Sequence, residues 1–129
     1  MIRIAIVDDS ETARMFIRRC LEIVGFSKAN FIEADNGKDA LEKIKKTPVD
    51  LILTDLTMPV MDGETLLKWI KSNPKLCEIP VLVITSAGNP AKESELIKIG
   101  AIGVLPKPIS PAKLNTFLAP FMKDKEEEQ

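Results

Sequence analysis

Near the middle of this chain stands Leu51-Ile52-Leu53-Thr54-Asp55-Leu56-Thr57-Met58-Pro59, an apolar run that ends on a single carboxylate. The apolar run predicts a buried strand, and the residues after Asp55, up to Pro59, begin a loop. A carboxylate at the end of a buried strand is costly unless something pairs with it. The candidate partners for this carboxylate lie far away in the sequence, and they are Asp8, Asp9, Thr85 and Lys107.

The totals are those of one small globular domain. The chain has 129 residues, of which 45% are hydrophobic and 29% are charged, and its net charge is −1. This near-neutral balance provides no electrostatic reason to expect binding to nucleic acid or to a membrane surface. No apolar run is long enough to span a bilayer, and residues 1–7 lead directly into two aspartates, so we expect no signal peptide.

Two residue types limit the chemistry and the compartment. The chain contains no histidine, which excludes a histidine general base, metal ligand or phosphocarrier within it. Cys20 and Cys77 fall in apolar helical or near-helical patterns, which predicts buried or half-buried thiols in a reducing, cytoplasmic compartment. Any reaction here must use carboxylates, hydroxyls and lysine.

The hydrophobic pattern predicts five strands that alternate with five helices. The strands are expected at residues 2–7, 31–34, 50–54, 81–84 and 102–105. Apolar stripes at helical spacing lie within residues 13–24, 40–44, 66–70, 96–97 and 114–121. The first, third and fourth strands are apolar on both faces, which is typical of a parallel sheet covered by helices on each side. We therefore expect an α/β, doubly wound domain over residues 1–122 and a charged tail over residues 123–129, disordered rather than functional.

The polar residues of interest follow four different strands of this predicted sheet. Asp8 and Asp9 follow the first strand, Asp55 ends the third, Thr85 follows the fourth and Lys107 follows the fifth. In a doubly wound parallel sheet the carboxyl ends of the strands form the functional crevice. We therefore expect these side chains to lie on one rim.

Three carboxylates on one rim repel each other unless a cation neutralises them. A hard dication with oxygen ligands fits this requirement, and Mg²⁺ with several retained waters is the natural choice. Lys107 would add a further positive charge.

Each of these residues also has a simpler structural interpretation when taken alone. Asp8, Asp9 and Ser10 suit the N-terminus of a helix. Asp55 would cap a turn, Thr85 would be a loop hydroxyl and Lys107 a solvated charge. The joint pattern favours a site.

The spacing of these residues resembles the receiver domain of two-component response regulators. The resemblance is carried by the aspartate pair after the first strand, Asp55 with Pro59 four and Gly63 eight positions later, Thr85, and the Lys107-Pro108 pair. It covers about residues 2–122. It implies a five-stranded parallel sheet of the flavodoxin-like type, with strand order 2-1-3-4-5 and helices on both faces. It also implies a cis bond between Lys107 and Pro108.

The resemblance assigns a role to each residue of the rim. Asp55 is the implied phosphoryl acceptor. Asp9, Asp55 and the backbone carbonyl of Thr57 are implied Mg²⁺ ligands, and Asp8 reaches the metal mostly through water. Lys107 and the Thr85 hydroxyl are expected to contact the phosphoryl oxygens. The implied phosphodonor is a sensor histidine kinase or a histidine phosphotransfer protein, and the chain is expected to be a stand-alone, chemotaxis-regulator-like switch that acts by binding a target protein.

The chain departs from the family pattern at one position that bears on its output. Receiver domains commonly carry an aromatic residue three positions before the lysine of the fifth strand, where this chain has Val104. Valine has no ring to swing and a stiff χ1, so the usual threonine–aromatic coupling is in question. The small residues 86–88 are an alternative route for the signal.

Two further features bear on the lifetime of the phosphoryl group and on partner docking. Thr57 and Ala87 stand where an acid or an amide would orient an attacking water, which predicts slow intrinsic dephosphorylation or reliance on a phosphatase. Arg14, Arg18 and Arg19 form either a docking patch or a solvated basic face.

Two other classes of protein fit parts of the pattern. An aspartyl-phosphate phosphohydrolase also uses an aspartate nucleophile and Mg²⁺, but there the nucleophile follows the first strand, with a second aspartate two residues later. A flavodoxin-like cofactor module needs a phosphate-binding loop rich in Ser, Thr and Gly after the first strand, which this chain lacks. The phosphoryl-accepting switch is therefore the leading hypothesis.

Overall fold

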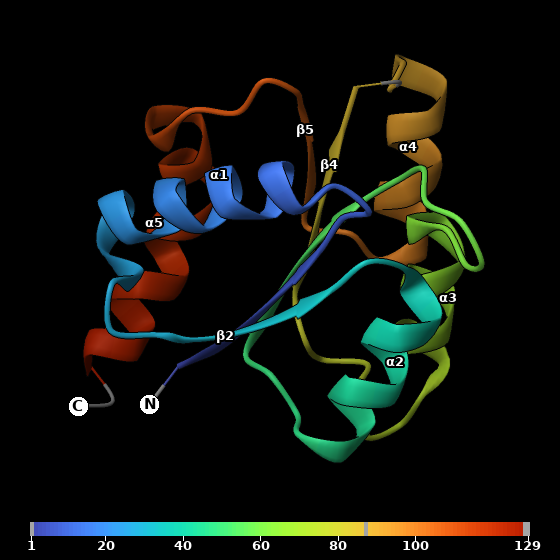
Figure 1. Ribbon diagram of the computed structural model, residues 1–129, viewed down its shortest axis with the longest axis horizontal. Coiled ribbons are helices and arrows are strands. Elements are labelled where there is room, and N and C mark those ends of the chain that lie inside the picture. Colours follow the sequence, from blue (N-terminus) through green and yellow to red (C-terminus); the bar gives the residue numbers. More distant parts are fainter. Residues whose placement is uncertain (1, 87, 128–129) are drawn as a thin grey trace.

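The computed structural model describes residues 2–86 and 88–127, with side chains through residue 120. Its centre is a five-stranded parallel sheet with the order β2-β1-β3-β4-β5, which confirms the predicted fold class (Figure 1). The strands are β1 (Arg3–Val7), β2 (Asn30–Ala34), β3 (Leu51–Asp55), β4 (Val81–Thr85) and β5 (Gly103–Pro106). The β3 strand occupies the middle of the sheet, so Asp55 ends a strand that is buried along its whole length.

Helices connect the strands and cover the sheet on both faces (Figure 1). They are α1 (Glu11–Leu21), α2 (Gly37–Lys46), α3 (Gly63–Ser72), α4 (Pro90–Ile99) and α5 (Pro111–Glu127), with a short π-helical turn, η1 (Glu22–Phe26), after α1. Polar side chains cap the N-termini of several of these helices. Ser10, Asn36, Asp62 and Asn89 each accept a hydrogen bond from a backbone N–H of the first turn.

Two apolar layers lie between the sheet and its helices. One face of the sheet packs on α1 and α5, through residues such as Ile17, Leu21, Leu114 and Leu118. The other face packs on α2, α3 and α4, through residues such as Ile44, Leu66, Ile70 and Leu96. All five residues of β3 and all five of β4 are buried, because both faces of these strands are covered.

Two details of the helices differ from the expected pattern. Phe16 belongs to the apolar stripe expected within residues 13–24, but it is 50% exposed. The helix α5 runs to Glu127 and so takes in most of the stretch expected to be a disordered charged tail. The side chain of Phe121, also expected to face inward, lies outside the described side chains. The domain boundary at residue 122 stays a prediction.

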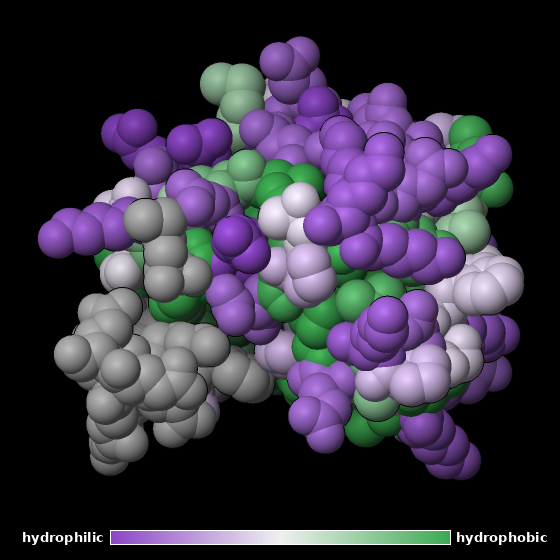
Figure 2. All heavy atoms as spheres, turned by 90° about the horizontal axis from the view of Figure 1, so that it is seen from below, coloured by the Kyte–Doolittle hydropathy of each residue, from purple (hydrophilic) through white to green (hydrophobic). Residues whose placement is uncertain are grey.

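The surface and the cysteines agree with the composition. Seen from below, the molecule presents mostly hydrophilic residues, with apolar residues in smaller areas between them (Figure 2). Among the residues that the structure describes, no helix is both long and apolar enough to cross a membrane. Cys20 is buried and Cys77 is half-buried, and both are free thiols, as predicted.

Candidate functional site

The aspartate pair lies between β1 and α1, with its members in different environments. Asp8 is 1% exposed, whereas Asp9 is exposed to solvent. One carboxylate oxygen of Asp8, Oδ1, accepts a hydrogen bond of 2.9 Å from the backbone N–H of Ser10. The hydroxyl of Ser10 accepts in turn from the N–H of Ala13 at 3.2 Å and caps α1. Ser10 therefore provides the cap expected for this segment, and the second oxygen of Asp8 faces the crevice.

Asp55 is the last residue of β3 and its side chain is 10% exposed. Its Oδ1 atom accepts a 2.8 Å hydrogen bond from the N–H of Leu56. The backbone of Gly63 passes so close that a Cβ at this position would lie 2.0 Å from the carbonyl oxygen of Asp55. Only glycine permits that approach, so the spacing of eight residues between Asp55 and Gly63 has a steric cause.

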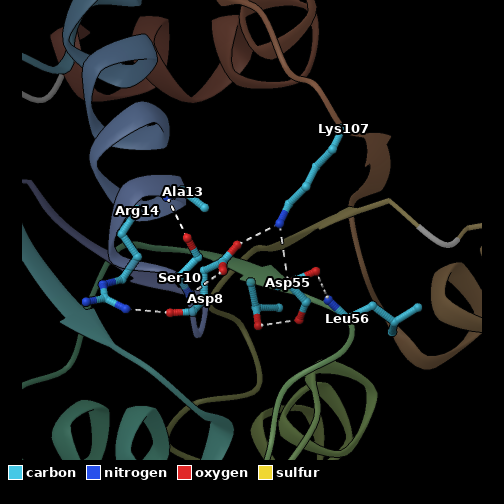
Figure 3. Close-up of polar contacts among 8 residues, drawn as sticks. Asp8, Ser10, Ala13, Arg14, Asp55, Leu56 and Lys107 are labelled. Carbon is cyan, nitrogen blue, oxygen red and sulfur yellow. Dashed lines mark hydrogen bonds and ion pairs between the residues drawn. The ribbon is translucent and has the colours of Figure 1, made fainter.

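Lys107 reaches across the crevice to two of the three aspartates. Its Nζ atom lies 2.8 Å from Oδ2 of Asp8 and 3.4 Å from Oδ2 of Asp55. Figure 3 shows the lysine side chain extending from the loop after β5 to a point between the two carboxylates. The bond between Lys107 and Pro108 is cis, as expected. The backbone N–H of Lys107 donates to the carbonyl of Thr85 at 2.9 Å, which ties this loop to the end of β4.

Burial and charge displace the pKa values of two of these groups. The pKa of Asp55 lies above its usual range, because burial disfavours the charged carboxylate and the charge of Asp8 adds to that effect. Lys107 and the N–H of Leu56 counteract the shift without cancelling it. Burial alone would lower the pKa of Lys107, but the hydrogen bond to Asp8 and the two negative charges outweigh it, so that pKa is raised.

Asp8, Asp9 and Asp55 offer carboxylate oxygens that all lie within 4.8 Å of one another. Three anionic oxygen donors at this spacing match the preference of a hard divalent cation. Burial, and then the charge of Asp8, raise the pKa of Asp55 although Lys107 lies beside it, so a further cation would favour the ionised carboxylate. The donor set and its charge therefore fit the expected metal site.

Thr85 and Val104 lie on the neighbouring strands β4 and β5. The side chain of Thr85, at the end of β4, is buried. A hollow of about 190 Å³ adjoins it, lined in part by Gly88, Val104 and Pro106. The structure thus places the predicted threonine on the rim and leaves open space beside Val104, where a larger side chain would fit. Pro106 lies on the edge strand β5, where its missing N–H is tolerated.

Sequence reasoning missed the structural roles of the arginines on α1. Arg14 donates to the carbonyl of Asp8 at 2.6 Å and forms an ion pair with Glu33 at 2.9 Å. The guanidinium of Arg18 lies 4.7 Å from the centre of the Phe31 ring. Arg14 is largely enclosed by these contacts, whereas Arg18 and Arg19 are exposed, so a docking patch on α1 stays a prediction. No spacing rule links Arg14 to Glu33, because the contact depends on how α1 packs beside β2.

Thr57 is exposed, in the loop that follows Asp55, and its role at the metal stays a prediction. Ala87, the other position expected to influence dephosphorylation, lies outside the described residues. The structure therefore brings together Asp8, Asp9, Asp55 and Lys107 and places Thr85 at the same rim.

Comparisons with known proteins agree with this arrangement. The family model described as the response regulator receiver domain matches residues 4–119. The chain is 38% identical over 113 residues to the chemotaxis protein CheY-3 of Vibrio cholerae, which covers 88% of this chain and 85% of that protein. It is 32% identical over 114 residues to the chemotaxis protein CheY1 of Helicobacter pylori, with 88% and 90% covered. The solved structure of the chemotaxis response regulator CheY4 of Vibrio cholerae superposes with a TM-score of 0.81 at 32% identity, over 93% of this chain and 98% of that one.

Proposed function

The chain belongs to the response regulator receiver domain family, and on that basis we propose that Asp55 accepts a phosphoryl group from a histidine of another protein. Receiver domains are signalling domains rather than conventional enzymes, so the phosphohydrolase alternative is set aside. The observation that carries the proposal is the position of Asp55, enclosed beside Asp8 and Asp9 and faced by Lys107. The receiver family implies that the donor is a sensor histidine kinase or a histidine phosphotransfer protein. The histidine must belong to that protein because this chain has none.

The transfer is a substitution at phosphorus. The ionised carboxylate of Asp55 attacks, a P–O bond forms as the P–N bond to the donor imidazole breaks, and the imidazole leaves with the electron pair of that bond. The hydrogen bond from Leu56 holds one carboxylate oxygen in place. The other oxygen faces Lys107, whose positive charge offsets the negative charge that accumulates on the phosphoryl oxygens.

The proposed metal is Mg²⁺, held by Asp9, Asp55 and the backbone carbonyl of Thr57, with Asp8 acting mostly through water. When bound, the ion would neutralise the carboxylates and the incoming phosphoryl charge. Asp8 has a second task that belongs to the protein itself. Its Oδ2 atom holds the Lys107 ammonium at 2.8 Å, so the lysine is already directed towards the acceptor.

Thr85 is proposed to bind a phosphoryl oxygen through its hydroxyl. Its backbone carbonyl already accepts from the N–H of Lys107, so the two phosphoryl-binding residues are connected through β4 and the loop after β5. A movement of either residue towards the phosphoryl group would therefore be transmitted to the other. This link does not need an aromatic ring at Val104.

The donor protein is proposed to dock on an apolar groove beside Lys107. The groove has a volume of about 320 Å³ and is lined by Ala13, Phe16, Ile17, Ile84, Lys107, Pro108 and Ile109. It accounts for the exposure of Phe16, since a helix of the donor can cover that ring and bring its phosphohistidine to the crevice. The proposed place of action is the cytoplasm, where the free thiols of Cys20 and Cys77 stay reduced.

Phosphorylation is tested with a small phosphodonor. The chain is incubated with Mg²⁺ and acetyl phosphate, and the intact mass is followed. We expect one added phosphoryl group that is stable to acid and labile to base, and none in the variant Asp55→Asn. Turnover of added phosphoesters without a stable adduct would instead support a phosphohydrolase.

The lifetime of that adduct tests the proposed role of Thr57. Because a threonine cannot readily orient an attacking water, the phosphoryl group should persist well beyond seconds in the purified protein. The variant Thr57→Glu supplies a carboxylate at this exposed position, so it should lose the group at least several-fold faster. An unchanged rate in this variant, or a wild-type half-life of seconds, would contradict the role assigned to Thr57.

A further inference from the structure

The loop between β3 and α3 carries a backbone conformation that few residues adopt. Val60 has a φ of 67° and is 78% exposed. A β-branched residue in this region is strained, and such strain persists only where the surroundings determine the conformation. The N–H of Met61 donates to the carbonyl of Pro59 at 2.7 Å, which closes a tight turn around Val60. The loop is therefore held in place by contacts on either side of this turn.

One of these contacts closes the loop on itself. The N–H of Gly63 donates to the carbonyl of Leu56 at 2.9 Å. Between these two residues, the side chain of Met58 is buried in the core layer of α2, α3 and α4, with Leu56 and Met61 packed against the same layer.

The other contact comes from the first residue of α2. The N–H of Gly37 donates to the carbonyl of Met61 at 2.9 Å. Gly37 is buried, and a Cβ there would lie 2.8 Å from both the Cγ and the carbonyl oxygen of Met61 and 3.0 Å from its sulfur. No real Cβ sits at such distances from a backbone oxygen, so Ala at position 37 would push the loop away from α2.

We infer that Gly37 is a positioning residue for the metal site, because it seats Met61 and thereby sets where the loop presents the carbonyl of Thr57. This inference rests on the proposed role of that carbonyl as a metal ligand. Gly37 is not a member of the acidic cluster, and its contacts given above are all with Met61. Its effect on the metal is transmitted through the loop alone.

The choice between two metal ions provides a sensitive measure of this effect. Mg²⁺ requires near-octahedral ligands at about 2.0–2.1 Å, whereas Ca²⁺ accepts irregular ligands at about 2.3–2.6 Å. A displaced carbonyl should therefore weaken the binding of Mg²⁺ more than that of Ca²⁺. A general loss of stability would affect both ions alike.

The test compares the variant Gly37→Ala with Lys38→Ala, which changes the next, exposed residue of the same helix. The melting temperature of the unphosphorylated protein is followed as Mg²⁺ or Ca²⁺ is added, which yields a dissociation constant for each ion. We expect Gly37→Ala to weaken Mg²⁺ binding roughly 10-fold, as is usual when a group that supports a metal ligand is changed, with a clearly smaller change for Ca²⁺. Lys38→Ala should bind both ions like the wild type.

The double variant Gly37→Ala with Met61→Ala adds a rescue. Removing the Cγ and sulfur of Met61 eliminates two of the three close approaches, so part of the Mg²⁺ affinity should return. If Gly37→Ala does not fold, the variant Met61→Ala tests the inference by itself. Removing the Met61 side chain from its contact with Gly37 should also weaken the binding of Mg²⁺ more than that of Ca²⁺. Equal losses for both ions, or wild-type Mg²⁺ affinity in a folded Gly37→Ala, would overturn the inference. A wild type whose melting temperature does not respond to Mg²⁺ would instead contradict the proposed metal site.

Discussion

The helices α3 and α4 border the crevice through the loops at their N-termini, and they are held by different forces. The helix α3 buries Gly63, Leu66, Leu67 and Ile70, whereas α4 buries Leu96 alone. A fully buried leucine contributes on the order of 2–3 kcal/mol, so α3 has several times the packing energy of α4. The loop with Asp55 thus leads into a firmly anchored helix, and the loop after Thr85 leads into a weakly anchored one.

Charged side chains provide much of the remaining attachment of α4. Lys92 lies 2.8 Å from Glu64 at the start of α3 and 2.9 Å from Glu95 on its own helix. The hydrogen bonds from Lys92 and Lys68 hold the pKa of Glu64 below its usual range. Ion pairs at the surface stabilise little and are screened by salt. The loop from Asp55 to α3 is therefore held firmly in place. The helix α4, in contrast, can move at a small cost in free energy when Thr85 binds a phosphoryl oxygen.

The largest loss of stability is expected when a methyl group is added at the start of α3. The variant Gly63→Ala places a Cβ against the backbone of Asp55, which cannot yield without moving β3. We expect the free energy of unfolding to fall by at least about 3 kcal/mol, measured by urea denaturation.

Gly88→Ala is the matched variant on the other side. Its Cβ would meet the methyl of Thr85 at 3.0 Å, beside the hollow near Val104. We expect a cost below about 1 kcal/mol, because a side chain beside open space can adjust. Equal costs for the two variants would contradict the contrast between the two sides.

A loss between those of Gly63→Ala and Gly88→Ala is expected from emptying the one buried position of α4. Leu96→Ala should lower the free energy of unfolding by roughly 2–3 kcal/mol. It should also remove the hydrogen-exchange protection of α4 while the amides of α3 keep theirs, because α4 has no second buried side chain. If α3 and α4 lose protection together, the two helices form one cooperative unit and the contrast is wrong.

The smallest effect is a pH dependence at the acceptor itself. Burial, and then the charge of Asp8, raise the pKa of Asp55 in the folded chain above its unfolded value, so ionised Asp55 destabilises the metal-free protein near neutral pH. Without metal, Asp55→Asn should therefore be the more stable form at pH 7. Its advantage should shrink as the pH falls through the raised pKa of Asp55 towards the ordinary value, because the wild type then gains its proton in the folded state first.

Added Mg²⁺ provides the control for that measurement. The ion should stabilise the wild type more than Asp55→Asn, since the variant lacks one of the three carboxylates. Thermal denaturation at several pH values, with and without Mg²⁺, measures both effects. An advantage of Asp55→Asn that grows on acidification would contradict the direction of the pKa shift.

Much of the fold and the rim could be predicted because the signals are local. Each strand is an apolar run with clear ends, and in a parallel sheet all such ends meet at one edge, so Asp8, Asp55 and Lys107 had to converge. The contacts of Arg14 and the exposure of Phe16 could not be predicted in this way. A helical stripe defines which side of α1 faces inward only to within a residue, and the neighbours of that side belong to β2 and to the loop after β5.

The sequence by itself determined which polar residues end or follow each strand and which residue types are available at the rim. Both depend only on hydrophobic periodicity and composition. Only the tertiary structure decided that the Lys107 ammonium lies between Asp8 and Asp55, that the pKa of the acceptor is raised, and that Gly37 seats Met61. These properties depend on distances of a few ångströms between segments far apart in the chain, and such distances follow from how the layers pack. The stretch around Asp55 thus predicts an acceptor, while its surroundings determine how it is held.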